Sequence, residues 1–513
     1  MRPTIGPEAR SPQSLSKRTL AGLIWLLMQS VIGRVVTLGS QIVLALALSP
    51  SDFGIISIVL ALNTLVFTIS NLGIEDLLLQ RKRHFGAWVA VASRLNFAFN
   101  FIAFLASFAV SYLASKYYAN AQITPLLFLA AFASLISSFQ LVPQTILKRD
   151  FNFKLVALIN TGEIIALQIF TIILAIVGFG AYSFVLPLPV VALLKLLVLS
   201  RLAYFSIGRT VRTRKPMVFY LLRNGMHLLS TRSIINCVSQ GDYIILGLFA
   251  SKSDVGAYYF SYKLAMQPLW LLAGNFSGVL IPTLIAMKDD PIRQKKAAFD
   301  TARLLSYIIF PVCFCQAALS APVLSVLFGQ KWESAVPILQ IISIGIAFDA
   351  VTWVTGAYLN ARQLYRATLY LTFIFATIYF PLVFSGAYFF GALGVATAVM
   401  IYFILLGPCM SHLVLGTAKS GEVIVSLFVK PVFLSILAVV PVYLFVCTFA
   451  DFARIIFLIV VSPIIYVFLV NRYVPDIIDD VLSRFFIKND VSSARILARL
   501  LTFGRPSHHQ RNC

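Results

Sequence analysis

Acidic residues are scarce in this chain, and so are charged residues in general. The 513 residues include 19 Asp and Glu against 41 Lys and Arg, and charged residues make up 12% of the total. A soluble globular chain contains roughly 25% charged residues. Because 59% of the residues are also hydrophobic, the composition excludes an ordinary soluble domain and predicts a membrane protein.

Cysteine is also rare, and its spacing does not suggest a metal centre. Most of the six cysteines lie in apolar stretches, and Cys313 and Cys315 would point to different faces of a helix. Neither a zinc site nor a disulfide framework fits this spacing. We therefore expect no metal and no cofactor. The Gly-x-x-x-x-Gly-Lys-Ser/Thr motif is missing as well, which excludes an ATPase of the Walker type.

Long hydrophilic loops are also missing. The longest non-apolar stretches are residues 206–221 and the tail 474–513, and neither can hold a catalytic domain. A polysaccharide polymerase or ligase typically needs a sizeable outer loop, and a processive synthase needs a soluble nucleotide-sugar domain. We therefore expect a transporter without catalytic residues. The basic tail is compatible with either an interfacial amphipathic helix or a disordered segment.

The chain does contain about fourteen long apolar segments, each long enough to cross a hydrocarbon core about 30 Å thick. Such segments must be helical, because backbone groups in a bilayer need partners within their own segment. Residues 20–48 are too long for the apolar region of a signal peptide and are interpreted as a retained first span. The predicted spans are 20–48, 53–74, 86–114, 124–147, 155–179, 180–205, 222–250, 255–287, 301–328, 335–360, 366–385, 387–416, 421–450 and 453–473.

Basic residues gather on every second connection between these spans. The intervening connections carry only Lys116, Lys252, Lys331 and Arg454. This is the positive-inside pattern, which places both termini in the cytoplasm and explains most of the net charge of +22 without nucleic-acid binding. The basic clusters after the second, fourth, sixth and eighth spans are Arg81, Lys82 and Arg83; Lys148, Arg149 and Lys154; Arg209, Arg212, Arg214 and Lys215; and Lys288, Arg293, Lys295 and Lys296.

An internal repeat relates two halves of the chain. The Ser-x-Ser-Asp-x-Gly pattern of residues 49–54 recurs at residues 251–256. Each copy follows an odd-numbered span, so the repeat unit is six spans. A repeat with an even number of spans keeps its orientation, and the two copies should be related by a pseudo-two-fold axis along the membrane normal. The sequence predicts two six-helix lobes facing one another across a central space, with two extra C-terminal helices.

The predicted organisation follows from this repeat. It comprises a cytoplasmic N-terminus at 1–19, an N-lobe at 20–205, a cytoplasmic inter-lobe loop at 206–221, a C-lobe at 222–416, two further spans within 417–473 and a basic cytoplasmic tail at 474–513.

Several charged residues fall inside the predicted spans. A charge at mid-bilayer costs roughly 2.5–3.5 kcal/mol on insertion scales, so such a residue normally faces a partner or water. We expect four cations to face a water-filled cavity: Arg34, Arg94, Arg232 and Lys263. Lys195, Arg201 and Arg303 are better explained by internal pairs or by side chains that reach the interface. A surplus of cations in a cavity predicts an anionic substrate, and arginine suits phosphate because its planar fork can engage two oxygens.

Buried anions are fewer. Glu163, Asp242 and Asp349 lie within predicted spans. They are candidates for coupling to a proton or sodium gradient, or for pairing with the buried cations, and the sequence leaves these alternatives open.

Several motifs together resemble a known family. The run from Leu44 to Gly54, followed by Asn71-Leu-Gly73 and Gln80-Arg81, is similar to the N-terminal region of Wzx-type polysaccharide transporters, in the multidrug/oligosaccharidyl-lipid/polysaccharide exporter superfamily. The second copy, from Asp242 through Tyr258, resembles the start of that family's second lobe. Pro282 with Asp289-Asp290, and Gly329-Gln-Lys-Trp332 with Ala335, Pro337 and Leu339, fit later positions. Relatives often carry Arg in place of Leu46, which leaves a substrate contact there in doubt.

The resemblance implies a flippase that moves an undecaprenyl-diphosphate-linked oligosaccharide from the cytoplasmic to the periplasmic leaflet of a bacterial inner membrane. It serves exopolysaccharide, lipopolysaccharide O-antigen or capsule synthesis, with the polymerase and co-polymerase of the same pathway as partners. A lipid II flippase and a multidrug exporter share the predicted architecture. The multidrug exporter is disfavoured because its organic-cation substrates call for buried carboxylates. Two alternatives come from other functional classes: an enzyme, namely a polysaccharide polymerase or ligase, and a structural scaffold without transport activity.

Overall fold

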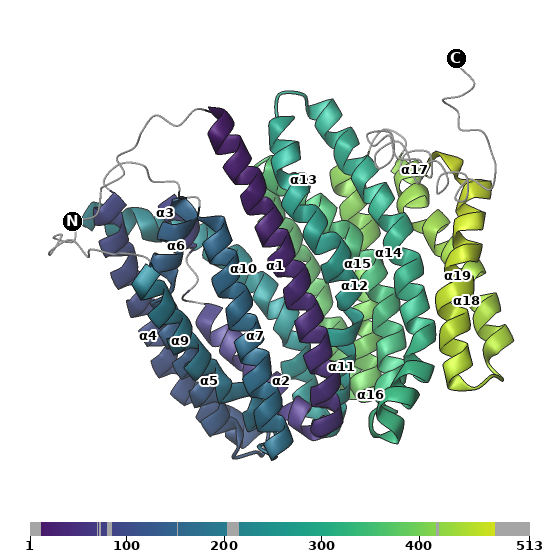
Figure 1. Ribbon diagram of the computed structural model, residues 1–513, viewed down its shortest axis with the longest axis horizontal. Coiled ribbons are helices and arrows are strands. Elements are labelled where there is room, and N and C mark those ends of the chain that lie inside the picture. Colours follow the sequence, from purple (N-terminus) through teal and green to yellow (C-terminus); the bar gives the residue numbers. More distant parts are fainter. Residues whose placement is uncertain are drawn as a thin grey trace. The chain divides into compact units, whose positions relative to one another are not determined.

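The computed structural model describes residues 12–68, 70, 73–79, 85–150, 152–202, 215–416 and 420–477. Nearly all of them are helical, and these ranges contain no strand (Figure 1). The prediction of an all-α protein is confirmed. The α-helices are α1 Pro12–Ala47, α2 Pro50–Thr68, α3 Ile74–Leu79, α4 Phe85–Tyr117, α5 Ile123–Ser138, α6 Leu141–Arg149, α7 Phe153–Val177, α8 Tyr182–Val185, α9 Pro187–Leu202, α10 Lys215–Phe249, α11 Lys252–Ala265, α12 Gln267–Leu269, α13 Asn275–Ala286, α14 Pro291–Phe328, α15 Ala335–Ala361, α16 Tyr365–Leu415, α17 Ser420–Ile424, α18 Lys430–Val446 and α19 Asp451–Tyr473.

Several predicted features lie outside the described residues. They are the N-terminus up to residue 11, the basic cluster at 81–83, most of the inter-lobe loop at 203–214 and the tail from residue 478. Parts of the quoted family motifs, at 71–72 and 80–81, also fall there.

Eleven helical segments of the described chain are long and apolar enough to cross a membrane, so this is a multi-span membrane protein. The remaining predicted spans fall on α10, on the interrupted series from α11 to α13, and on the second part of α16. Helix α10 carries Arg223, Arg232 and Asp242 among its apolar residues, which makes it more polar than spans such as α7 and α15. The count of fourteen crossings stays a prediction.

The helix α16 contains the break that the sequence predicts near residue 386. Its 51 residues would extend about 75 Å as one straight helix, at 1.5 Å per residue, far beyond a hydrocarbon core of about 30 Å. Gly391 interrupts it with φ 58 and ψ −136, a conformation that glycine adopts far more readily than other residues. The break therefore lies a few residues later than predicted.

The chain forms two compact units. Unit 1 comprises Met1–Tyr259 and Leu369–Ala392, and unit 2 comprises Phe260–Thr368 and Leu393–Cys513. One boundary falls inside α11 and another after Ala392 in α16, one residue beyond Gly391. These units are defined by packing, whereas the lobes 20–205 and 222–416 were inferred from the repeat. The lobe boundaries remain a prediction.

The two copies of the repeat have matching local structure at the starts of α2 and α11. In the first copy the Ser49 hydroxyl donates to Asp52 Oδ2 (2.6 Å), and in the second the Ser251 hydroxyl donates to Asp254 Oδ2 (2.7 Å). In both, the Asp backbone N–H donates back to the serine oxygen, at 3.3 Å and 3.2 Å. Serine and aspartate at this spacing cap a helix start, which explains why the sequence repeats them.

The repeated glycines also bring the two copies into direct backbone contact within unit 1. A Cβ built on Gly54 would lie 1.9 Å from the carbonyl oxygen of Lys252, and one on Gly256 would lie 1.7 Å from that of Pro50. Only a residue without a side chain allows two helices to approach so closely. Residues equivalent by the repeat therefore meet one another, as expected beside a local two-fold axis.

Unit 1 packs its first helices around an apolar cluster and along small residues. Buried side chains of α3, α4, α6 and α10 meet at Leu78, Val89, Val142 and Leu221. Helix α1 lies along α7, where a Cβ on Gly33 would be 3.0 Å from Ile164. These contacts set the depth at which the charged residues of α1, α4 and α10 lie.

In unit 2, α14 is the common neighbour of α15, α18 and α19 (Figure 1). The ring of Phe310 in α14 lies 5.0 Å from Phe348 in α15 and 6.2 Å from Phe428, which precedes α18. The Tyr466 hydroxyl of α19 donates to the Tyr307 carbonyl (2.8 Å). The last two helices therefore pack on α14 as an integral part of unit 2.

Candidate functional site

Arg34 lies midway along the apolar helix α1 and is half-buried. The preceding residue, Gly33, packs against Ile164 of α7, so Arg34 lies at the depth of Glu163 in the neighbouring helix. A guanidinium at this depth of an apolar helix is costly unless it meets a polar or charged group. Arg34 therefore lies inside an apolar helix as expected from the sequence, and its role in substrate binding stays a prediction.

Arg94 and Arg232 belong to α4 and α10, which pack together through Val91, Ala92 and Leu221. Arg94 is exposed on the surface of unit 1, whereas Arg232 is half-buried. Downstream in α10, Asn236 Nδ2 donates to the Thr68 hydroxyl of α2 (2.9 Å). Three of the four predicted cations, Arg34, Arg94 and Arg232, thus belong to unit 1.

Lys263 is half-buried and belongs to unit 2. It sits near the end of α11, just before an irregular stretch. There α12 is followed by a π-helical turn at Trp270–Gly274. The Lys263 carbonyl accepts from Gln267 Nε2 (3.1 Å), and the next carbonyl, that of Leu264, accepts from Gln316 Nε2 of α14 (2.9 Å). Single π-turns inside helices are frequent at functional sites.

The three predicted carboxylates have hydrogen-bond or ionic partners. Lys195 Nζ of α9 donates to Glu163 Oε2 of α7 at 2.7 Å, and the side chains are 10% and 30% exposed. Asp242 is buried and accepts from the Tyr258 hydroxyl of α11 (2.7 Å). Asp349 of α15 accepts from the Thr352 hydroxyl in its own helix (2.8 Å). The sequence left open whether Glu163 couples transport to an ion gradient or pairs with a buried cation. In the structure it pairs with Lys195.

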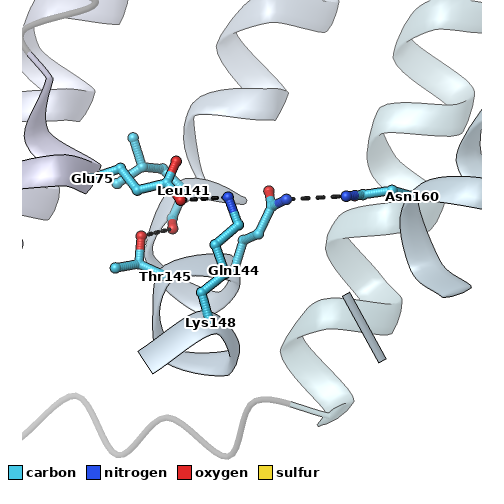
Figure 2. Close-up of polar contacts among 6 residues, drawn as sticks. All are labelled: Glu75, Leu141, Gln144, Thr145, Lys148 and Asn160. Carbon is cyan, nitrogen blue, oxygen red and sulfur yellow. Dashed lines mark hydrogen bonds and ion pairs between the residues drawn. The ribbon is translucent and has the colours of Figure 1, made fainter. Parts of the chain in front are cut away.

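A second ion pair of unit 1 was not foreseen in the sequence. Lys148 Nζ of α6 donates to Glu75 Oε1 of α3 at 2.5 Å. Beside it, Gln144 Nε2 donates to Asn160 Oδ1 of α7 at 3.4 Å (Figure 2). Lys148 was predicted only as part of a basic connection. Its partner Glu75 was missed because nothing in the spacing shows that the short α3 lies against α6.

Buried amides add a further polar network that the sequence does not reveal. Asn96 of α4 donates to the Ser138 carbonyl (2.8 Å), and Asn100 donates to the Asn96 carbonyl (2.7 Å). Gln140 donates to the Ala192 carbonyl of α9 (2.7 Å). The Asn96 bond joins α4 to α5, and the Gln140 bond joins the turn between α5 and α6 to α9, whereas the Asn100 bond lies within α4. All three act structurally, because each amide satisfies a backbone carbonyl.

Unit 2 contains an apolar hollow of about 690 Å³ beside α14. Its wall includes Leu271, Val312, Ile459 and Val467, with few polar atoms. Such a surface suits a hydrocarbon chain rather than a sugar or a phosphate. Its apolar lining contrasts with the charged positions described above.

A basic hollow of about 1100 Å³ lies at the start of α14, also in unit 2. Its lining includes Lys295, Lys296, Arg303, Arg362 and Lys430. The sequence pointed to Lys295 and Lys296 as a cytoplasmic cluster and to Arg303 as a cation within a helix. It did not show that they surround one space with Arg362 and Lys430.

Among the described residues, no three His, Cys, Asp or Glu side chains are grouped so that they could hold a metal ion. Cys237, Cys313, Cys315, Cys409 and Cys447 are all free thiols.

Comparison with known proteins places this geometry in context. Residues 43–337 match the polysaccharide biosynthesis protein family. The lipopolysaccharide biosynthesis protein WzxC of Escherichia coli K12 is 24% identical over 452 residues, which cover 84% of this chain and 88% of WzxC. The succinoglycan biosynthesis transport protein ExoT of Rhizobium meliloti 1021 is 25% identical over 329 residues, covering 61% and 64%.

A solved structure shares the fold at low sequence identity. The inward closed conformation of the lipid II flippase MurJ aligns with a TM-score of 0.73 at 15% identity, covering 89% of this chain and 100% of MurJ. The architecture is therefore that of a multi-span transporter fold.

Proposed function

This chain belongs to the polysaccharide biosynthesis protein family, and from that premise we propose that it is a flippase for oligosaccharides linked to undecaprenyl diphosphate. It moves them from the cytoplasmic to the periplasmic leaflet of the bacterial inner membrane. Its similarity to WzxC and to the transport protein ExoT supports this assignment. Both termini are cytoplasmic, and the pathway's polymerase and co-polymerase act on the product.

The observation that carries the proposal is the half-buried Arg34 in the middle of the apolar helix α1. An arginine at this depth can bind the negatively charged diphosphate that the substrate offers. Arg34, Arg94, Arg232 and Lys263 bind this head group. Charge-assisted bonds from arginine to phosphate are strong, and two parallel N–H donors fix their geometry. The lipid tail remains in contact with apolar surfaces.

The carboxylates take different roles in this proposal. Glu163 holds Lys195 and thereby joins α7 to α9, and Asp242 holds Tyr258. Asp349, whose side chain accepts a hydrogen bond from a hydroxyl of its own helix, is the candidate for ion coupling. The protein carries no catalytic residues, and transport draws on an ion gradient or on consumption of the exported product.

The test uses a strain that lacks the gene for this protein. It should accumulate lipid-linked oligosaccharide in the inner leaflet and stop polysaccharide output, and the wild-type chain should restore both. The double variant Arg34→Ala/Arg232→Ala should insert in the membrane normally but restore less than a tenth of the output. Each lost charge-assisted bond is worth about 1.5–3 kcal/mol, and 1.4 kcal/mol corresponds to tenfold.

The matching variant Arg34→Lys/Arg232→Lys separates charge from geometry. Partial restoration is expected, because lysine keeps the charge but lacks the planar fork. Full output from the alanine double variant would reject the roles of both arginines. Accumulation of lipid II, with normal handling of the oligosaccharide lipid, would instead assign the lipid II flippase activity.

A further inference from the structure

The basic hollow of unit 2 is bounded by the ends of several helices. It lies among the first turns of α14, the end of α15, the end of α16 and the beginning of α17 and α18. The connection before the predicted span 301–328, which includes Lys288 and the first turns of α14 with Arg293, is predicted to be cytoplasmic. The hollow therefore opens where the positive-inside pattern places the cytoplasmic membrane surface.

Its charges are strongly unbalanced. The lining contains one carboxylate, Glu422, against five cations: Lys295, Lys296, Arg303, Arg362 and Lys430. Within the described chain, none of these five cations forms an ion pair with a carboxylate. Like charges held around one space repel one another, so the arrangement favours the arrival of an anion.

Hydrogen bonding of the cations leads to the same conclusion. Lys295 donates to the Gly416 carbonyl, and Arg362 Nη1 donates to the Tyr358 hydroxyl at 3.2 Å. These neutral acceptors position the side chains without neutralising their charge. The Nε atom of Arg303 is buried and has no hydrogen-bond partner in the described structure. Buried donors without partners are uncommon in folded proteins, and one beside a hollow indicates a missing acceptor.

The remaining lining suits a lipid rather than a small hydrated ion. Ile292, Phe299, Val423 and Val425 place apolar surface beside the cations. The volume of about 1100 Å³ slightly exceeds that of ordinary ligand sites, which span roughly 300–1,000 Å³. Basic pockets between membrane helices on the cytoplasmic side bind anionic lipid head groups.

We propose that this hollow binds the phosphate head group of an anionic lipid of the cytoplasmic leaflet. The site is separate from the residues assigned to transport, since neither Lys263 nor any of the three arginines lines it. Two lipids offer this chemistry: a bilayer phospholipid such as phosphatidylglycerol, and a polyprenyl diphosphate. The shared feature is a phosphate group attached to a hydrocarbon chain.

The test measures lipid binding to the purified full-length protein in detergent, by native mass spectrometry with increasing phosphatidylglycerol. Zwitterionic phosphatidylcholine serves as the reference lipid. The pocket variant is Lys296→Gln/Arg362→Gln, in which both altered side chains are exposed, so folding should be retained. The matched control is Arg293→Gln/Arg366→Gln. It removes the same charge from nearby exposed positions outside the lining.

The wild-type protein should prefer phosphatidylglycerol to phosphatidylcholine by at least tenfold. The pocket variant should lose at least tenfold in affinity, whereas the control should change less than twofold. Equal losses in both variants would reduce the effect to general surface charge and overturn the proposal. Equal binding of the two phospholipids, with no binding of the polyprenyl lipid at the pocket, would also overturn it.

A second arm identifies the source of the head group. Undecaprenyl diphosphate is added to protein saturated with phosphatidylglycerol. If it displaces the phospholipid from wild-type protein and binds the pocket variant at least tenfold less tightly, the polyprenyl diphosphate is the occupant. If it does not displace the phospholipid, a bilayer phospholipid is the occupant. Because the readout is binding, it can succeed or fail independently of translocation through Arg34 and Arg232.

Discussion

Unit 1 joins its membrane helices through charged pairs, whereas unit 2 gathers cations around a hollow. In unit 1, Lys195 bonds Glu163 across α7 and α9, and Lys148 bonds Glu75 across α3 and α6. In unit 2, the cations beside α14 contact neutral acceptors. Lys148 and Lys195 therefore join helices in unit 1, whereas the lysines and arginines beside α14 in unit 2 keep their charge available for a ligand.

The comparison shows that a charged residue in an apolar helix cannot be interpreted from its depth alone. Lys195 and Arg34 both lie deep in apolar helices of unit 1. Lys195 has a carboxylate partner at 2.7 Å and is explained by helix packing. Substitutions can therefore separate cations that hold the protein together from cations that bind a ligand.

The largest effect should come from the glycine contact that joins the repeat copies in unit 1. Gly256→Ala places a Cβ 1.7 Å from the Pro50 carbonyl oxygen, so α2 and α11 must move apart. We expect a loss of about 3 kcal/mol or more, at the upper end for overpacking, seen as little folded protein after detergent extraction and size-exclusion chromatography.

Two control substitutions calibrate that result. Gly162→Ala in α7 meets no atom within 4 Å and should be neutral or stabilise by up to about 1 kcal/mol, since alanine is the better helix former. In Gly407→Ala of unit 2, the new Cβ would lie 2.6 Å from the Phe348 carbonyl oxygen. Its loss of stability should fall between those of Gly162→Ala and Gly256→Ala. Normal yield of the Gly256→Ala protein would contradict the close approach of the two helices.

Breaking the more buried ion pair of unit 1 should give the next largest effect. Lys195→Met leaves the carboxylate of Glu163 without its partner. Breaking a fully buried pair costs roughly 3–5 kcal/mol, and because Glu163 is 30% exposed we expect about 2 kcal/mol. The thermal unfolding midpoint in detergent measures this loss.

The double variant Glu163→Gln/Lys195→Met should recover most of the stability, because no unpaired charge then remains. A double variant whose loss equals the sum of the two single losses would show that the pair does not join α7 to α9.

The second ion pair of unit 1 should matter less. Lys148 and Glu75 are 30% and 34% exposed, and exposed pairs contribute about 0.2–1 kcal/mol. Lys148→Gln should therefore lower the unfolding free energy by about 0.5 kcal/mol in the same measurement. A loss as large as that of Lys195→Met would show that the exposure of an ion pair does not predict its contribution to stability here.

The smallest effect, with the opposite sign, is expected in unit 2. Lys296→Gln removes one of several like charges around the basic hollow. Without lipid, relief of repulsion should raise stability by a few tenths of a kcal/mol, comparable in size to like-charge pairs on helices. Added phosphatidylglycerol should stabilise this variant less than the wild type. A lipid-free loss above about 1 kcal/mol would indicate that Lys296 has a structural role.

Much of the fold could be predicted from periodic and local patterns. Continuous apolar segments indicate membrane helices, and the Ser-x-Ser-Asp-x-Gly repeat indicated equivalent positions in two halves of the chain. The structure shows that both copies have the same serine–aspartate hydrogen bonds at a helix start. The sequence did not reveal that the series after α11 is broken by a π-helical turn, or that the break in α16 falls at Gly391. Such positions depend on packing between distant segments.

The candidate site was only partly accessible from the sequence. Charge in an apolar segment singled out Arg34 and Glu163, because that contrast is local. Which helices are neighbours decides the ion pairs and the basic hollow. Lys195 pairs with Glu163 for this reason, and Glu75 pairs with Lys148. Arg303 lies with Arg362 and Lys430 for the same reason. That information lies in contacts between residues far apart in the chain, and no spacing along one helix contains it.

The most direct measurement of the central claim is translocation of a labelled undecaprenyl-diphosphate oligosaccharide in proteoliposomes. The variant Arg34→Gln/Arg232→Gln is compared with Lys148→Gln/Arg149→Gln, which removes the same charge from a connection of unit 1. The account predicts at least a tenfold lower rate for the first variant and an unchanged rate for the second. An undiminished rate in Arg34→Gln/Arg232→Gln, with both proteins folded, would contradict it.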